Sequence, residues 1–144
     1  MKYNAFISSA SSESDASCAI IIVPDKGEMI KKILPFKDCT ANKADLQGIK
    51  YIDCAIQDDN ADITINSTNA YIVGMVDKNK AKEWSKTPKQ NEELVKYMRE
   101  KVESKRIKII YGSGIYIEKV KWWAKSIYRL KDGIPEGGKT PLEV

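Results

Sequence analysis

The sequence predicts a single α/β domain in which three strands come first and helices and strands then alternate. Its 144 residues match the length of one ordinary domain, and a composition of 42% hydrophobic and 31% charged residues is typical of globular proteins. Over the first 36 positions the apolar residues alternate with polar ones or form short β-branched runs, and afterwards they recur mainly at helical spacing. These observations predict the element order β-β-β-α-β-α-α-β-α.

The first part of the chain predicts a three-stranded antiparallel meander. Residues 2–8 alternate only loosely between apolar and polar side chains, and residues 18–23 form a β-branched run that ends at a Pro-Asp-Lys-Gly turn signal in residues 24–27. Residues 29–36 supply the third strand, and the Ser-rich residues 8–17 are predicted as a turn between the first two. Strands joined by such short connections are antiparallel.

A change of period marks the remaining elements. Thr40 fits the N-cap of a helix that extends to about residue 56, because apolar residues recur there at helical spacing. We expect further strands at residues 61–67 and 106–111, and further helices at residues 69–76, 89–104 and 116–130. A polar, Lys-rich link is expected at residues 77–88. The predicted domain spans residues 1–130, and residues 131–144 form a Gly/Pro-rich C-terminal tail.

The composition excludes several classes of active site. The chain contains no histidine, which excludes Ser-His-Asp and Cys-His nucleophilic chemistry and the usual zinc sites. Its three cysteines, Cys18, Cys39 and Cys54, include no Cys-x-x-Cys pair and fit reduced core residues better than disulfides or zinc ligands. The longest apolar run, residues 18–23, is too short to cross a bilayer, and the first residues lack a signal-peptide core. We therefore expect a cytoplasmic protein without cofactor, metal or membrane contact.

The charges are distributed unevenly along the chain. Residues 1–77 carry 7 Lys and 11 Asp or Glu, a net charge of −4, whereas residues 78–125 carry 14 Lys or Arg and 6 Asp or Glu, a net charge of +8. A basic half beside an acidic half predicts one positive face, which would attract nucleic acid or an acidic partner. A lysine-rich, solvated surface without a partner is the alternative interpretation.

Four local patterns resemble those of a known superfamily. Residues 40–46, Thr-Ala-Asn-Lys-Ala-Asp-Leu, are similar to a Thr-x-Asn-x-x-Glu-Leu pattern that opens a helix. Residues 63–74 resemble a strand that runs into Asp-Ser and a short helix, and residues 90–94 resemble a Lys-Asn-x-x-Leu segment. Residues 109–124 combine a strand, a glycine turn and a helix, in which Glu118 matches a glutamate. Together these patterns resemble the ribonuclease H-like superfamily, in particular its type 1 domain.

The resemblance implies a ribonuclease H-like three-layer α/β fold, with a five-stranded mixed sheet and helices on both faces. It also implies a site where four carboxylates hold two divalent ions that activate water at a phosphodiester. At the matched positions the first aspartate falls at Ser8 or Ser9, the helix glutamate at Asp45, the aspartate after the fourth strand at Thr68 and the last aspartate at Lys121.

Only Asp45 of these positions is still acidic, and Lys121 brings a positive charge to where the ions would lie. The histidine of the family's mobile loop is also absent. Because magnesium requires oxygen ligands in near-octahedral geometry, hydroxyls and a lysine do not replace the missing carboxylates. We therefore expect a catalytically degenerate member that lacks three of the four metal-binding carboxylates and is not an enzyme.

The residues that contact substrate in this superfamily are better retained. Asn42 and Asn91 match positions that lie at the minor groove of the bound nucleic acid, and the Lys-rich link resembles the family's basic handle. The candidate contacts in the link are Lys78, Lys80, Lys82, Trp84 and Lys86. Lysines can neutralise phosphates and an exposed tryptophan can stack on a base, so the resemblance implies binding of duplex nucleic acid or RNA–DNA hybrid.

Two other interpretations remain open. The chain can be a scaffold for protein contacts or self-association, as in a viral or mobile-element protein that acts in the host cytoplasm without binding nucleic acid. It can also be a residual enzyme in which Asp45 is joined by carboxylates of a partner subunit.

Overall fold

The computed structural model describes residues 1–77 and 90–132, with side chains described as far as Ser126. The strands are β1 Lys2–Ser12, β2 Asp15–Pro24, β3 Ile30–Phe36, β4 Asp62–Ser67 and β5 Ile107–Tyr111. The helices are α1 Ala41–Ala55, α2 Ala70–Met75, α3 Glu92–Glu103 and α4 Ile115–Asp132. The element order predicted from the sequence is confirmed.

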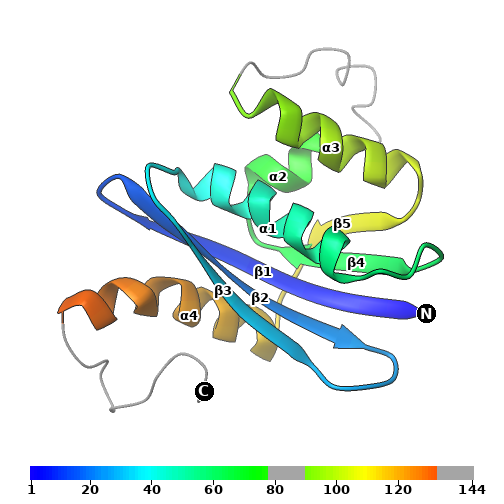
Figure 1. Cartoon of the computed structure of the whole chain (residues 1–144), viewed down its shortest axis with the longest axis horizontal. Coiled ribbons are helices and arrows are strands. Elements are labelled where there is room, and N and C mark those ends of the chain that lie inside the picture. Colours follow the sequence, from blue (N-terminus) through cyan, green and yellow to red (C-terminus); the bar gives the residue numbers. More distant parts are fainter. Residues whose placement is uncertain (78–89, 133–144) are drawn as a thin grey trace.

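The strands form one five-stranded mixed sheet in the order β3-β2-β1-β4-β5. β1 pairs with β2 and β2 with β3 in antiparallel fashion, so the predicted meander is confirmed. β4 pairs in parallel with both β1 and β5. Helices α1, α2 and α3 lie on one face of the sheet and α4 lies on the other (Figure 1). The predicted three-layer arrangement is therefore confirmed.

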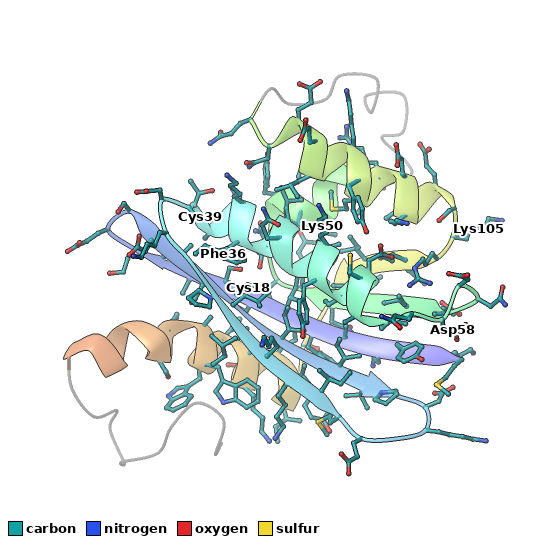
Figure 2. The ribbon with its side chains drawn as sticks, viewed as in Figure 1. Cys18, Phe36, Cys39, Lys50, Asp58 and Lys105 are labelled. Carbon is teal, nitrogen blue, oxygen red and sulfur yellow. The ribbon has the colours of Figure 1, made fainter. Side chains whose placement is uncertain are left out.

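The central strands are buried on both faces because a helix layer covers each side. Ala5 and Ile7 of β1 pack in the core under α1 and α3, whereas Phe6 between them packs in the core under α4. This follows from the strand period, in which successive side chains point to opposite faces. Cys18 of β2 lies in the core under α1 and α3 (Figure 2). A Cβ atom at Gly48 of α1 would lie 2.5 Å from the Cys18 Sγ, so this close approach requires glycine.

The boundaries of the first two strands differ from the prediction. β1 continues to Ser12 and β2 begins at Asp15, so the predicted Ser-rich turn at residues 8–17 is wrong. The chain reverses over only two residues, with Glu13 in a left-handed conformation at φ 54°. The antiparallel ladder extends past the last apolar pairs because its backbone hydrogen bonds do not depend on the polarity of the serine side chains.

The helix boundaries are closer to expectation. Thr40 is the N-cap of α1, where its hydroxyl oxygen accepts a hydrogen bond from the Lys43 backbone N–H at 3.2 Å. α3 begins at Glu92 instead of residue 89, because Asn91 has a left-handed φ of 63° and cannot be part of the helix. α4 continues to Asp132, two positions past its predicted end.

Several sequence predictions lie outside the described residues. These are most of the Lys-rich link and residues 133–144 of the tail, so the domain boundary at residue 130 stays a prediction. All three cysteines are free, but only Cys18 is a core residue, since Cys39 is half-buried and Cys54 is exposed. No helix within the described ranges has both the length and the apolar character needed to cross a membrane.

Candidate functional site

Asp45 stands at the centre of a polar cluster between α1 and the sheet. Its side chain is buried, with only 3% of the residue exposed. The Ser9 hydroxyl of β1 donates to Asp45 Oδ1 at 2.5 Å, and the Asn69 amide nitrogen donates to Asp45 Oδ2 at 2.8 Å. Both carboxylate oxygens are therefore engaged, and Asp45 joins β1, α1 and the junction between β4 and α2.

Asn69 connects this carboxylate to a second amide. Its Nδ2 also donates to Asn42 Oδ1 at 2.8 Å, while its Oδ1 accepts from the backbone N–H of Tyr71 at 3.0 Å as the N-cap of α2. We call Ser9, Asn42, Asp45 and Asn69 the Asp45 cluster. Every hydrogen bond that Asp45 receives within it comes from a neutral donor. Burial raises the pKa of the Asp45 carboxyl, and the hydrogen bonds from Ser9 and Asn69 oppose that rise.

The two serines offered by the sequence for the first acidic position occupy different faces of the sheet. Ser9 lies an even number of positions from Ala5 and Ile7, so it shares their face of the sheet and reaches Asp45. Ser8 lies two positions from Phe6 and therefore faces the α4 side. The structure thus brings Ser9, Asp45 and the residues after β4 together, and exposed Thr68 lies directly before Asn69.

Lys121 belongs to the α4 side of the sheet. α4 runs alongside β1, since the rings of Phe6 and Tyr116 are 5.1 Å apart and the Ser17 hydroxyl of β2 donates to the Ala124 carbonyl at 2.7 Å. Lys121 lies between these contacts along the helix, and its Nζ is 3.8 Å from a Glu118 carboxylate oxygen. Within the described part of the chain no hydrogen bond or ion pair joins Lys121 to Asp45.

A second polar cluster lies farther along α1 and was not found from the sequence. Asp53 is 7% exposed, and the Arg106 guanidinium donates to its Oδ1 at 2.6 Å. The Tyr97 hydroxyl donates to Asp53 Oδ2, and Lys101 Nζ lies 3.6 Å from the same oxygen. We call Asp53, Tyr97, Lys101 and Arg106 the Asp53 cluster. The signal that could have revealed it is an acidic residue beside the buried apolar stripe of a helix, which requires a partner.

The guanidinium of Arg106 also binds the end of α1. It donates to the carbonyl oxygens of Asp53 at 3.1 Å, Ile56 at 2.5 Å and Asp58 at 2.5 Å. Carbonyls at the end of a helix have no partner inside the helix, and a cation there also interacts favourably with the helix dipole. The Asp53 cluster is therefore a structural clamp between α1, α3 and β5.

Comparison with known proteins identifies the architecture. No protein-family model and no curated protein matches the chain. LC11-RNase H1, isolated from compost by a metagenomic approach, is 11% identical with a TM-score of 0.69 over 90% of this chain and 97% of that one. RNase H1 of the halophilic archaeon Halobacterium salinarum NRC-1 is 15% identical with a TM-score of 0.60 over 92% and 99%. The chain has the ribonuclease H-like fold.

Nucleic acid is present in some structures of similar fold. The foamy viral protease–reverse transcriptase, solved in complex with double-stranded DNA, is 14% identical with a TM-score of 0.63 over 88% of this chain and 89% of that one. LC11-RNase H1 has also been solved in complex with an RNA/DNA hybrid. At identities of 11–15% this similarity establishes the fold alone. The activity of this ribonuclease H-like domain must be inferred from the residues of this chain.

The Asp45 cluster does not fit the pair of divalent ions that the resemblance implies. It offers one carboxylate, and both oxygens of that carboxylate already accept hydrogen bonds from Ser9 and Asn69. Such ions require several oxygen ligands with near-octahedral geometry, whereas the neighbours of Asp45 direct donor hydrogens toward it. Among the residues that the structure describes, no group of three acidic, histidine or cysteine side chains could hold a metal ion.

The asparagines matched to nucleic-acid contacts lie near the first turns of two neighbouring helices. Asn42 is half-buried at the start of α1, and Asn91 directly precedes α3; both helices begin at the same end of the molecule (Figure 1). Asn91 lines an open groove of about 700 Å³ between α1 and α3, together with Lys43, Gln47 and Lys50 of α1. Lys50 reaches from α1 toward α3 (Figure 2), where its Nζ lies 5.4 Å from the centre of the Tyr97 ring.

The remaining predicted contacts lie outside the described residues. These are Lys78, Lys80, Lys82, Trp84 and Lys86 of the link. Sequence reasoning missed Asn69, although the pattern Ser-Thr-Asn-Ala-Tyr after β4 carries the signal of a helix N-cap, which places a side-chain amide at this end of the sheet.

Proposed function

We propose that this ribonuclease H-like domain binds duplex nucleic acid, RNA–DNA hybrid in particular, and does not hydrolyse it. The observation that carries the proposal is the engagement of both Asp45 oxygens by neutral donors from Ser9 and Asn69. Two-metal hydrolysis needs several carboxylates whose oxygens are free to bind the ions. In the Asp45 cluster, hydroxyl and amide groups surround the one carboxylate instead of further carboxylates. Such groups can form hydrogen bonds with a nucleic-acid backbone or groove.

The charge distribution supports binding. The stretch 78–125 carries a net charge of +8 and includes the basic link. Duplex and hybrid helices are recognised largely through phosphates, 2′-hydroxyls and shape, and none of these contacts requires a catalytic metal. We infer that the link lysines bind phosphates, that Trp84 offers a stacking surface, and that Asn42 and Asn91 contact the minor groove.

Salt-dependent binding tests the proposal directly. We expect a fluorescent RNA–DNA hybrid to bind the full chain with an affinity that falls steeply with salt concentration, measured by fluorescence anisotropy. The slope of log K against log salt is negative, and each phosphate contact contributes about 0.9 to its magnitude on duplex DNA. Reversing three link charges (Lys78→Glu, Lys80→Glu and Lys82→Glu together) should therefore reduce that magnitude by about 2–3.

A matched triple variant controls for net charge. Lys2, Lys26 and Lys32 are exposed and lie in or beside the first three strands, away from the link in sequence. Reversing these three charges changes the net charge equally and should leave most of the hybrid affinity intact. Equal losses in both triple variants, or an affinity of the unmodified chain that does not respond to salt, would overturn the proposed binding surface.

Hydrolysis is tested separately. We expect no cleavage of the hybrid in Mg²⁺ or Mn²⁺ above the level of a buffer control, because one carboxylate cannot assemble the two-ion site. Metal-dependent cleavage that disappears in Asp45→Asn would contradict the non-catalytic part of the proposal. It would favour the residual enzyme in which partner carboxylates complete the site.

A protein-binding scaffold is the second candidate function. Two large apolar residues, Tyr111 at 61% and Ile115 at 68% exposed, flank the glycine turn between β5 and α4. Large apolar side chains that are exposed on both sides of one turn favour a protein contact. A self-associated species in sedimentation experiments that is indifferent to salt and lost in Tyr111→Ser with Ile115→Ser, combined with no hybrid binding, would favour this function. A viral or mobile-element source is a prediction from the resemblance in either case.

A further inference from the structure

The hydrogen bonds of the Asp45 cluster have a direction that can be deduced from one backbone group. The Tyr71 backbone N–H is a donor, and it lies 3.0 Å from the side-chain oxygen of Asn69. An amide side chain presents one acceptor oxygen and one donor nitrogen, so the opposite side of Asn69 must present its NH₂ group. That group lies 2.8 Å from Asp45 Oδ2, an acceptor when ionised, and the assignment is consistent at both ends.

The same reasoning fixes the orientation of Asn42. Asn69 Nδ2 has two hydrogens and two neighbours at 2.8 Å, Asp45 Oδ2 and the Asn42 side chain. The Asn42 atom that faces it must accept, so this atom is Oδ1 and the Asn42 NH₂ group points away from the cluster. Within the described residues this nitrogen has no hydrogen-bond partner, and Asn42 is only half-buried.

We propose that Asn69 and Asp45 are positioning residues that hold the Asn42 amide in a single orientation, so that it offers only N–H donors to the minor groove of bound nucleic acid. The inference rests on the proposed function, because it concerns how the same surface recognises its ligand. Asp45, at the position matched to a metal ligand, acts here through two amides. Ser9 supports it by donating to the other carboxylate oxygen at 2.5 Å.

A donor-only contact selects a particular ligand chemistry. The minor groove presents acceptors at purine N3 and pyrimidine O2, and 2′-hydroxyl oxygens also accept in RNA strands. The guanine N2 amino group is the one donor on the base edges there, and it opposes an incoming N–H group. The domain should therefore favour A·U and A·T pairs at the Asn42 contact, and replacing guanine with inosine in the probe, which removes that amino group, should restore affinity.

A double-mutant cycle tests the positioning role. Asn42→Ala should weaken binding of an RNA–DNA hybrid about tenfold, the effect of losing one hydrogen bond with good geometry. Asn69→Ser removes the bridging NH₂ group but keeps a side chain favoured at the N-cap of α2, so α2 should remain formed. We expect about a fivefold loss for Asn69→Ser alone and no further loss when it is added to Asn42→Ala.

A purely structural role of Asn69 predicts a different result. In that case Asn69→Ser would lower affinity by the same factor with or without the Asn42 side chain, and this outcome would overturn the proposal. A loss for Asn42→Ala with no loss for Asn69→Ser would overturn it as well. Circular dichroism and urea unfolding of each variant establish that the compared proteins are folded.

Asp45→Asn supplies a conservative control. The new amide oxygen can accept from Asn69, and the new amide nitrogen can donate to Ser9, because a serine hydroxyl both donates and accepts. The orientation of Asn42 is then preserved, and hybrid affinity should stay within about twofold, whereas Asp45→Ala removes the acceptor and should reduce it about fivefold. Equal affinity in the two Asp45 variants would contradict the role of the acceptor.

The orientation itself can be measured without any ligand. In the free protein we expect the side-chain NH₂ hydrogens of Asn69 to exchange slowly with solvent, because both are hydrogen-bonded, and those of Asn42 to exchange rapidly in nuclear magnetic resonance spectra. Rapid exchange at Asn69 or protection at Asn42 would disprove the orientation. If the hybrid does not bind at all while this exchange pattern is observed, the proposed function fails and the orientation stands.

Discussion

Asp45 and Asp53 lie eight positions apart on α1 and are both buried, at 3% and 7% exposure. Eight residues span a little over two helical turns, so the two side chains leave the helix about 80° apart around its axis. Their partners differ. Asp45 receives hydrogen bonds from the neutral groups of Ser9 and Asn69, whereas Asp53 is bound by the cations Arg106 and Lys101 and by the Tyr97 hydroxyl.

This difference gives the two carboxyl groups opposite pKa shifts. In both groups burial favours a higher pKa, because removal from water disfavours the charged form, and the partners of each group then decide the net shift. At Asp45 burial prevails over two neutral hydrogen bonds and the pKa is raised. At Asp53 the hydrogen bonds from Tyr97 and Arg106 and the charges of Lys101 and Arg106 prevail, and the pKa is lowered. The partners of a buried acid in this fold therefore decide the direction of its pKa shift: cations lower the pKa of Asp53, whereas neutral donors leave the pKa of Asp45 above its ordinary value.

The largest effect should follow from removing Arg106. Arg106→Ala leaves Asp53 buried without its main cation and frees three carbonyl oxygens, and we expect the free energy of unfolding to fall by about 3–5 kcal/mol. Urea denaturation followed by circular dichroism measures this value. Lys108→Ala, at an exposed position of β5, is the matched control and should change it by less than about 0.5 kcal/mol. Similar values for both variants would mean that Arg106 is not a structural clamp.

Replacing each aspartate with its uncharged analogue separates the two clusters. Asp53→Asn leaves the Arg106 charge without a counter-ion and should lower the free energy of unfolding by about 2–3 kcal/mol at pH 7. Asp45→Asn keeps its contacts with Ser9 and Asn69 and should change it by less than about 1 kcal/mol. The same urea titrations supply both numbers. A larger loss at Asp45 than at Asp53 would reverse the comparison.

The two aspartates should also give stability opposite pH dependences. The folded protein retains the Asp45 proton at pH values where the unfolded chain has released it, so the stability that Asp45 contributes falls as pH rises from about 4 through the raised pKa. The contribution of Asp53 is present above about pH 4 and is lost as pH falls through its lowered pKa.

Unfolding titrations between pH 3 and pH 7 measure these slopes. We expect the stability difference between the unmodified chain and Asp53→Asn to grow with rising pH. The difference between the unmodified chain and Asp45→Asn should shrink or change sign over the same range. Two differences that move in the same direction would show that the partners do not control the ionisation as described.

The smallest effect belongs to Lys101, a half-buried member of the Asp53 cluster. Lys101 is 33% exposed and its Nζ lies 3.6 Å from Asp53 Oδ2, so water and salt screen much of the attraction. Lys101→Ala should lower the free energy of unfolding by less than about 1 kcal/mol. The loss should diminish further in 1 M salt. A loss as large as that of Arg106→Ala would mean that distance and exposure are poor guides within this cluster.

The parts of the fold that follow local rules could be predicted from the sequence. Thr40 and the helical spacing after it predict α1, and the short connections predict the antiparallel meander. The serine-rich ends of β1 and β2 could not be predicted, because their strand conformation is imposed by pairing with each other and not by their own side chains. α3 begins three positions later than predicted, because Asn91 has a left-handed backbone conformation that only the folded chain reveals.

The candidate site was predictable only in part for a related reason. Asp45 could be located by its helix pattern, but its partners come from β1 and from the end of β4, 36 and 24 positions away in sequence. Arg106 lies 53 positions from Asp53. No periodicity links residues at such separations, so the choice between Ser8 and Ser9 and the role of Asn69 required the folded chain.

Trp123 gives the molecule an optical reporter of one layer. Its indole is fully buried in the core under α4, with Lys31 Nζ 5.7 Å from the ring centre and no hydrogen-bond partner for Nε1 among the described residues. In a variant with Trp84→Phe and Trp122→Phe, the remaining tryptophan emission comes from this ring; it should lie toward the blue and shift to the red when α4 separates from the sheet. Amide exchange in α1 reports the opposite layer, so the two signals together reveal whether the layers on either side of the sheet unfold as one unit or in succession.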